Sequence, residues 1–489
     1  MIYQSTRNNN EKVNSAQAIV KGIASDGGLY MLKDFSLLNF DYKSVLNLTT
    51  METAEKVLHA LLDDFSKEQM HCMVEAAYKG RFETDELTPV VKVGSHFVLE
   101  LFRGPTSAFK DVALSMLPRL MTESRKMLNK TKDTVILTAT SGDTGKAALE
   151  GFHDVEGIKI IVFYPDGGVS AVQKAQMVTQ EGSNVCVCAV RGNFDDAQTG
   201  VKNAFAAFRE SGNDTVELSS ANSINIGRLA PQVVYYFTAY SNLVKRGEIN
   251  VGDKINFVVP TGNFGDILAG YFAKCMGLPV NKLICASNAN NVLTDFINTG
   301  VYDRRREFYK TVSPSMDILV SSNLERLLYL LSDCNADEVA GYMKDLSEKG
   351  FYKVSDSLLS KLQETFVAAY TDDSVTLETI KEVYDKNGYL CDTHTAVAFR
   401  AALDTEVEGK TVILSTASPY KFPVAVLSAL GVTPEENEFR VMDKLCEITG
   451  VKIPKNLSGL ESKKVLHNTV IEKENLTEFV MKKVAEEKW

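Results

Sequence analysis

Lys110 is the residue of this chain best suited to covalent chemistry. It stands in the segment GPTSAFKD (residues 104–111), directly before the apolar helical pattern VALSMLPRLM. A lysine at such a helix start can be partly buried, and burial lowers the pKa of an amine, as a Schiff-base nucleophile requires. An isolated lysine is more often a solvated surface residue, so this motif by itself leaves both interpretations open.

The segment TGNFGD (residues 261–266) could bind an oxyanion. Gly262 and Gly265 stand three apart after an apolar run and before a helical pattern. Glycine lets backbone N–H groups turn inward, and a helix N-terminus adds partial positive charge, which together suit a phosphate. The spacing is not that of the dinucleotide motif GxGxxG, and an ordinary strand–helix turn is the alternative interpretation.

The segment TSGDTGK (residues 140–146) also joins an apolar run to a helical pattern. Its hydroxyls add to the N–H donors, which suits a small carboxylate or phosphate, whereas helix capping is the alternative. It is not a nucleoside-triphosphate loop, because Thr140 and Ala147 occupy positions that require Gly and Ser or Thr.

A third polar segment, LSSANSINIGR (residues 218–228), combines amides, hydroxyls and one arginine. Asn222, Ser223, Asn225 and Arg228 could together bind a phosphate or carboxylate. The alternative is a helix capped by an asparagine, with Arg228 on its solvent face.

Histidine and cysteine do not show the spacing of a metal site. The segment CDTH (residues 391–394) is the only tight cluster, with no HExxH motif and no second Cys/His pair at zinc spacing. Cys186 and Cys188 would share one face of a strand, which is a weak hint only. We therefore expect no bound metal, and free thiols typical of a reducing compartment.

Short apolar runs must position these segments. Such runs lie at residues 134–139, 159–164, 255–260 and 411–415, and a Gly/Ser/Thr-rich turn and a helical pattern follow each. Continuous apolar strands alternating with helices predict an α/β fold with parallel sheets covered on both faces. Ligands in such folds bind beyond the carboxyl ends of the strands, where the polar segments lie.

We expect four parts along the chain. They are an N-terminal, mainly helical domain (1–95, with helices at 50–62 and 67–78), the lysine segment with a smaller α/β domain (96–230), a larger domain with a helical insertion at about 321–390 (231–430), and a C-terminal helical cap (431–489).

Charge and composition narrow the class of protein. The formal net charge of -10 argues against binding to nucleic acid or to an anionic membrane. The first residues lack the apolar core of a signal peptide, and no apolar run reaches the roughly 20 residues of a membrane span. We therefore expect a soluble, cytoplasmic protein.

Taken in order, the motifs resemble those of one enzyme family. GPTSAFKD, TATSGDTG, SANSIN with a downstream arginine, PTGNFGD, SPSMDI, DTHTA and STASPYKF, with the early SDGGLYM, are similar to threonine synthases of the longer bacterial and fungal type. The resemblance extends from about residue 1 to 425. It implies a pyridoxal 5'-phosphate (PLP) enzyme of fold type II, the tryptophan-synthase β type, with two parallel-sheet α/β domains and the site between them.

The same resemblance implies roles for individual residues. Lys110 would bind PLP covalently, and the hydroxyl of Thr416 would face the pyridine nitrogen. The cofactor phosphate is expected at Gly262, Asn263, Phe264 and Gly265, with Asp266 in the same cofactor-binding group. The substrate carboxylate is expected at Ser141, Gly142, Asp143 and Thr144, and the substrate phosphate at Thr106, Asn225 and Arg228, with Ser107 and Lys146 as further candidates.

The implied reaction converts O-phospho-L-homoserine and water into L-threonine and phosphate, in a monomer or weak homodimer. A phospho-lyase that yields 2-oxobutyrate, ammonia and phosphate is the nearest alternative, because both reactions pass through similar unsaturated intermediates. A non-catalytic PLP- or phosphate-binding protein is the alternative from another class. An α/β dehydrogenase is disfavoured, because its glycine fingerprint is absent.

Overall fold

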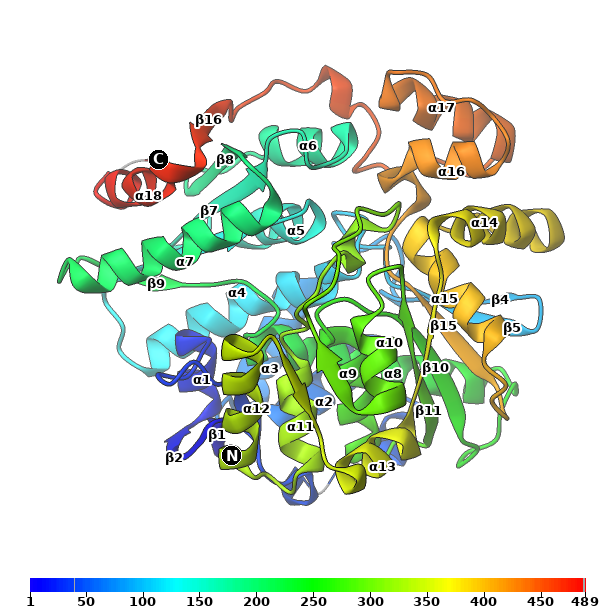
Figure 1. Ribbon diagram of the computed structural model, residues 1–489, viewed down its shortest axis with the longest axis horizontal. Coiled ribbons are helices and arrows are strands. Elements are labelled where there is room, and N and C mark those ends of the chain that lie inside the picture. The colour runs from blue at the N-terminus through cyan, green and yellow to red at the C-terminus, as the bar shows by residue number, and fades with distance from the viewer. Residues whose placement is uncertain (39, 487–488) are drawn as a thin grey trace.

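The larger of two parallel sheets forms the centre of the molecule in the computed structural model, which describes residues 1–38, 40–486 and 489 (Figure 1). Its strand order is β14-β11-β10-β15-β5-β4, and every neighbour pairs in parallel except β4 with β5. The strands are β4 (Val90–Val93), β5 (His96–Glu100), β10 (Ile255–Pro260), β11 (Val280–Ser287), β14 (Phe366–Tyr370) and β15 (Thr411–Ser415).

Both faces of this sheet are covered by helices, as its apolar strands require. Phe257 and Val259 of β10 belong to one core with helices α8 and α9, whereas Val258 belongs to a second core with helix α15. Successive side chains of a strand point to opposite faces, so a continuous apolar run fits a sheet that is buried on both sides. The covering helices are α8 (Ile226–Lys245), α9 (Gly265–Cys275), α10 (Val292–Thr299) and α15 (Thr393–Asp404).

The smaller sheet has five parallel strands in the order β16-β8-β7-β6-β9. The strands are β6 (Asp133–Ala139), β7 (Ile158–Pro165), β8 (Val185–Arg191), β9 (Val216–Ser219) and β16 (Thr469–Glu472). Helices α4 and α5 pack on one face, and helices α7 and α18 on the other. The helices of this domain are α4 (Lys110–Met127), α5 (Asp143–Phe152), α6 (Ala171–Val178), α7 (Phe194–Glu210) and α18 (Leu476–Val484).

The N-terminal segment packs along one side of both domains. Strands β1 (Tyr3–Ser5), β2 (Asn8–Val13) and β3 (Tyr30–Leu32) form an antiparallel sheet, with helix α1 (Ser15–Lys21) between β2 and β3 in the chain. Helices α2 (Thr50–Leu61) and α3 (Lys67–Tyr78) follow. Capping boxes of Thr49 with Glu52 and of Ser66 with Gln69 begin α2 and α3, each satisfying two free backbone donors. The two helices predicted here are therefore confirmed to within one residue.

The remaining helices lie around the larger sheet. Those of the insertion are α11 (Leu324–Leu331), α12 (Ala336–Glu348), α13 (Asp356–Thr365) and α14 (Asp373–Asn387), and those near the C-terminus are α16 (Pro423–Ala429) and α17 (Glu438–Thr449). A short antiparallel pair, β12 (Val301–Asp303) with β13 (Phe351–Lys353), accompanies the insertion. No helix in the described ranges is both long and apolar enough to cross a membrane.

The predicted fold type is confirmed, but the domain boundaries need correction. Strand β5, at the start of the expected smaller domain 96–230, belongs to the larger sheet because it pairs with β15. The insertion 321–390 supplies β14 at the edge of that sheet. The segment 431–489 is more than a helical cap, since β16 extends the smaller sheet beside β8 and α18 packs on α7.

Candidate active site

A cavity of about 520 Å³ lies between the two sheets, beyond the carboxyl ends of β6, β10 and β15. Side chains from both domains line it. Of the residues predicted for the site, it is lined by Lys110, Ser141, Asp143, Thr144, Arg228, Gly262, Asn263, Phe264, Gly265, Asp266 and Thr416. Segments far apart in the sequence thus meet at one place, as the rule for parallel sheets predicts.

A buried carboxylate shapes the loop that carries Lys110. Asp111 accepts hydrogen bonds from the backbone N–H of Thr106 at 2.9 Å and from the hydroxyl of the same residue. A Cβ atom at Gly104 would lie 2.5 Å from the Asp111 side chain, so only glycine allows this approach. Ser107 adopts a left-handed conformation with φ of 60°. The small residues of GPTSAFKD are therefore required for the tight turn that begins α4 with Lys110.

The same loop is joined to the end of β15. The N–H of Phe109 donates to the carbonyl of Thr416 at 2.8 Å, and the N–H of Ser418 donates to the carbonyl of Ser107 at 3.1 Å. These backbone bonds fix Lys110 beside Thr416 without using the Thr416 hydroxyl. The predicted proximity of the cofactor lysine and the threonine thus has a clear structural basis.

The buried amine of Lys110 lies next to both an aromatic ring and a carboxylate. Its side chain is only 11% exposed, its Nζ lies 3.8 Å from Asp143 Oδ2, and it stands 4.4 Å from the centre of the Phe109 ring. Burial lowers the pKa of Lys110, and Asp143 acts in the opposite direction. A buried amine with a lowered pKa is more often neutral, which suits a nucleophile and a base.

The segment 262–266 forms a cradle at the start of α9. Ser321 Oγ donates to the carbonyl of Gly262 at 2.6 Å, and the backbone and side-chain amides of Asn323 donate to the carbonyl of Asn263, both at 3.1 Å. Phe264 precedes α9 in a left-handed conformation with φ of 62°. Because these carbonyls turn toward residues 321–323, the first N–H groups of α9 stay available for an anion.

Asp266 differs from its neighbours in this cradle. Tyr236 donates to its Oδ1 at 2.9 Å and Tyr235 also donates to this atom, and burial raises the pKa of Asp266 to about 6. A carboxylate repels a phosphate, so this side chain is unsuited to bind one. Only its backbone can contribute to the predicted cofactor site.

The turn between β6 and α5 presents two hydroxyls to the cavity. Thr140 Oγ1 accepts from the N–H groups of Gly142 at 3.0 Å and Gly145 at 2.8 Å, which fixes the turn. Ser141 and Thr144 line the cavity on either side of Asp143. The carboxylate of Asp143 points at Lys110, so the groups of this turn that suit an anion are the two hydroxyls and the N-terminus of α5.

Arg228 is the cation that faces the cavity from α8. It is 3% exposed, its Nη1 donates to the carbonyl of Ala221 at 2.6 Å, and its Nε has no partner among the described residues. Burial lowers the pKa of Arg228 to about 10. A buried guanidinium with a free donor on a cavity wall fits an anionic ligand.

Several residues predicted to contact the substrate are not among the residues that line the cavity. Thr106 and Asn225 are fully buried away from the cavity, the first bound to Asp111 and the second capping α8 through the N–H of Gly227. The Ser107 hydroxyl donates to Asn456. The Lys146 amine donates to both Glu150 and Gln180. Gly142 lies behind the wall, its φ of 130° placing it against Gln173. These side chains shape the site without lining it.

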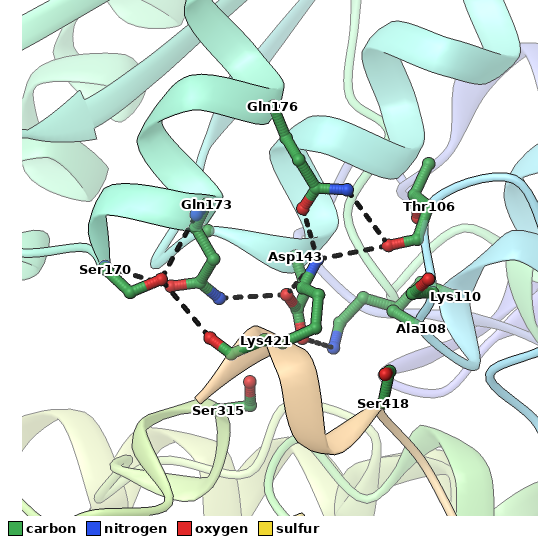
Figure 2. A network of polar contacts seen from close by, with 12 residues as sticks. Thr106, Ala108, Lys110, Asp143, Ser170, Gln173, Gln176, Ser315, Ser418 and Lys421 are labelled. Atoms are coloured by element: carbon green, nitrogen blue, oxygen red, sulfur yellow. Dashed lines mark hydrogen bonds and ion pairs between the residues drawn. The ribbon is translucent and has the colours of Figure 1, made fainter. Parts of the chain in front are cut away.

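His394 and Lys421 are two of the residues at or near the cavity that were absent from the predicted set. His394 lines the wall, with its Nδ1 bound to Asp392 Oδ2 at 2.7 Å and its Nε2 accepting from the N–H of Ser315 at 3.1 Å. Lys421 lies behind Asp143 and pairs with it at 2.8 Å (Figure 2). Both belong to quoted motifs, DTHTA and STASPYKF, and that membership is the only signal in the sequence that could have identified them.

Comparison with known proteins agrees with this geometry. The family model described as pyridoxal-phosphate dependent enzyme matches residues 83–418, and those for the threonine synthase N terminus and C-terminal part match residues 2–78 and 395–480. Residues 83–418 contain the lysine, the cradle and Thr416, so the chain is a PLP-dependent enzyme by class. Its buried amine and the N-terminus of α9, which line the same cavity, fit an aldehyde that carries a phosphate.

Relatives narrow the class further. Threonine synthase of Pseudomonas aeruginosa is 39% identical over 89% of this chain and 92% of its own length. The crystal structure of PLP-bound threonine synthase from Brucella melitensis matches with a TM-score of 0.87 and 37% identity, covering 99% of this chain and 100% of that one. The chain belongs to the threonine synthase family, as the motif series indicated.

Another relative is longer than this chain. Threonine synthase-like 1 of Homo sapiens is 41% identical over 85% of this chain, and the match spans 58% of that protein's length.

Proposed function

We propose that this protein converts O-phospho-L-homoserine and water into L-threonine and phosphate. One observation carries the proposal: the buried amine of Lys110, the α9 cradle and Arg228 line the same cavity. The family membership shown above supports the same conclusion.

PLP is the cofactor of the class, and its binding residues are proposed as follows. Lys110 holds the aldehyde carbon, the backbone of residues 262–265 with the N-terminus of α9 holds the phosphate, and the Thr416 hydroxyl faces the ring nitrogen. When bound, PLP supplies an electron sink for the negative charge that forms at the substrate Cα.

Lys110 then moves the protons. Once the substrate amine has displaced it, the free amine of Lys110 takes the proton from Cα and later returns one to the same atom. A single group that acts as base and acid works best with a pKa near the working pH. The lowering of the pKa of Lys110 by burial agrees with this role.

The remaining polar groups orient the substrate. The hydroxyls of Ser141 and Thr144 bind its carboxylate at the start of α5, and the guanidinium of Arg228 binds its phosphate. The walls of the cavity, formed by both domains, keep stray water away from the reacting carbon atoms.

The setting of the enzyme completes the proposal. Reduced thiols, the net charge of -10 and a biosynthetic reaction agree with a cytoplasmic protein acting in threonine biosynthesis, one that binds neither nucleic acid nor membrane. A monomer or weak homodimer is proposed, as the resemblance of the motif series implies.

The test is to incubate the purified protein with PLP and O-phospho-L-homoserine and to quantify threonine, 2-oxobutyrate and free phosphate together. Threonine equal to phosphate is expected, and Lys110→Ala should abolish both. Mainly 2-oxobutyrate would assign the protein to the lyases, and the absence of phosphate release would refute the proposed substrate.

A further inference from the structure

A second lysine is buried beside Lys110. Lys421, the last residue of the short helix η4 (Pro419–Lys421), has no exposed side-chain surface, although lysine is almost never fully buried unless it is paired. Its Nζ donates to Asp143 Oδ1 at 2.8 Å, to Gln176 Oε1 at 2.7 Å and to the carbonyl of Thr106 at 3.2 Å (Figure 2). An ammonium has three donors, so this charge is fully compensated and its position is fixed.

One carboxylate stands between the two lysines. Oδ1 of Asp143 faces Lys421, while its Oδ2 lies 3.8 Å from Nζ of Lys110. Gln173 Nε2 also donates to Oδ1, at 2.9 Å, so Oδ1 is held twice and Oδ2 is left to Lys110. Lys421 itself does not line the cavity among the described residues, so it acts through Asp143.

The same contacts join the two domains. Asp143 and Gln176 lie on α5 and α6 of the smaller domain, whereas Lys421 follows β15 of the larger sheet. The carbonyl of Lys421 also accepts from Ser170 Oγ at 3.3 Å, at the start of α6. The position of Asp143 relative to Lys110 therefore depends on a bond that crosses between the domains.

We propose that Lys421 is a positioning residue, which holds the Asp143 carboxylate against Lys110 and limits how strongly that carboxylate stabilises the protonated amine. This inference rests on the proposed role of Lys110 as the carrier of the Cα proton. An unopposed carboxylate would keep Lys110 protonated, and a protonated amine cannot act as a base.

The charges around Lys110 determine in which direction its pKa changes when one of them is removed. Asp143 from α5 and Asp266 from α9 raise the pKa of Lys110, while Arg228 from α8 and Lys421 lower it, as burial also does. The ring of Phe109 is the other group against the amine. Removing the Lys421 charge therefore raises the pKa of Lys110, and removing the Asp143 charge lowers it.

The test compares the pH dependence of kcat for the holoenzyme and its Lys421→Met, Lys421→Arg and Asp143→Asn variants. In the enzyme–substrate complex, the acidic limb of kcat reports the proposed base. Lys421→Met should move that limb to higher pH by about one unit, from the loss of a nearby charge. Asp143→Asn should move it to lower pH, and Lys421→Arg should leave it near its original position.

A purely structural role gives a different result. If Lys421→Met lowers kcat by the same factor at every pH, or shifts the limb in the same direction as Asp143→Asn, the proposal is wrong. The double variant Lys421→Met/Asp143→Asn removes both charges and should bring the acidic limb back toward its original pH. It also replaces the Lys421→Met variant in the test if that variant does not fold, because it leaves no unpaired buried carboxylate.

A second measurement needs no substrate. The visible absorbance of PLP bound to Lys110 changes when their linking nitrogen gains a proton, and this pH midpoint should shift in the same directions in the same variants. If the native protein releases no phosphate from O-phospho-L-homoserine, the proposed function fails, while this titration still decides the role of Lys421. Unchanged midpoints in Lys421→Met and Asp143→Asn would overturn the inference.

Discussion

At the scale of single residues, Arg228 shows how two interpretations of one motif can both hold. Asn225 caps α8 through the N–H of Gly227 at 2.9 Å, as the capping interpretation predicts. Three residues on, Arg228 is buried at the wall of the cavity instead of facing solvent, and its Nε has no hydrogen-bond partner among the described residues. The helix dipole disfavours a cation at the start of a helix, so the burial of Arg228 there agrees with its proposed role in binding an anionic ligand.

Replacing Arg228 tests that role. Arg228→Met should raise the KM for O-phospho-L-homoserine by about 10- to 100-fold, the worth of a hydrogen bond to a charged group. Steady-state kinetics measure the KM, and competition by added inorganic phosphate, which is expected at the same guanidinium, should weaken in parallel. The KM of Arg228→Lys, which keeps the charge but not the planar donors, should lie between those of the native protein and Arg228→Met. A fall in kcat alone, with KM unchanged, would contradict this assignment.

Burial of individual polar residues is what the sequence predicts least well. Lys110 is identified by its motif and its position before a helix, whereas Lys421 is buried because Asp143, Gln176 and Thr106 arrive from three distant segments. No local pattern contains that information. For the same reason the sequence did not indicate that Thr106, expected at the substrate, is fully buried.

At the scale of elements, the start of α11 supports the cradle at residues 262–265 that is proposed to bind the cofactor phosphate. Asn323 holds the carbonyl of Asn263, and the buried Arg326 holds Asn323 Oδ1 at 2.6 Å. Arg326 also donates to the carbonyls of Tyr30 at 3.0 Å and Ile224 at 2.6 Å. This one side chain thus ties the insertion to the N-terminal sheet and to the loop before α8.

We expect Arg326→Met to weaken PLP binding by about 10-fold or more, because buried carbonyl acceptors lose a charged donor and the cradle loses its support. Equilibrium dialysis or the absorbance of bound PLP measures the affinity. Arg440→Met, at an exposed arginine of α17, is the matched control and should bind PLP like the native protein. A lowered melting temperature with unchanged PLP affinity would show that Arg326 supports the fold and not the cradle.

Elements with a continuous apolar pattern were predicted well, and edge strands were not. The runs at 134–139 and 255–260 match β6 and β10 to within one residue, because strands buried on both faces must be apolar throughout. Strand β16 has largely exposed residues. It forms because β8 offers a free edge, and this pairing partner lies far away in the sequence.

At the scale of the whole molecule, the two domains share one chain that passes between them more than once. It leaves the larger sheet after β5, returns after β9, and goes back to the smaller domain before β16. The C-terminal helix α18 thereby closes one face of the smaller sheet (Figure 1). The stability of half the active site therefore depends on residues near the end of the chain.

Leu476 of α18 provides the test. It is fully buried against Val201 and Phe208 of α7 in one core, and a Cβ atom at Gly200 would lie 2.7 Å from its Cδ1. Leu476→Ala should lower the free energy of unfolding by about 2–5 kcal/mol, from lost burial and a cavity. Leu466→Ala, the same change at a side chain that is 45% exposed, should stay within about 0.5 kcal/mol. Urea unfolding followed by circular dichroism measures both free energies, and equal effects would mean that α18 adds nothing to this core.

A separate transition at lower urea concentration in Leu476→Ala would show further that the smaller domain unfolds before the larger, since the substitution weakens only the core that α18 completes.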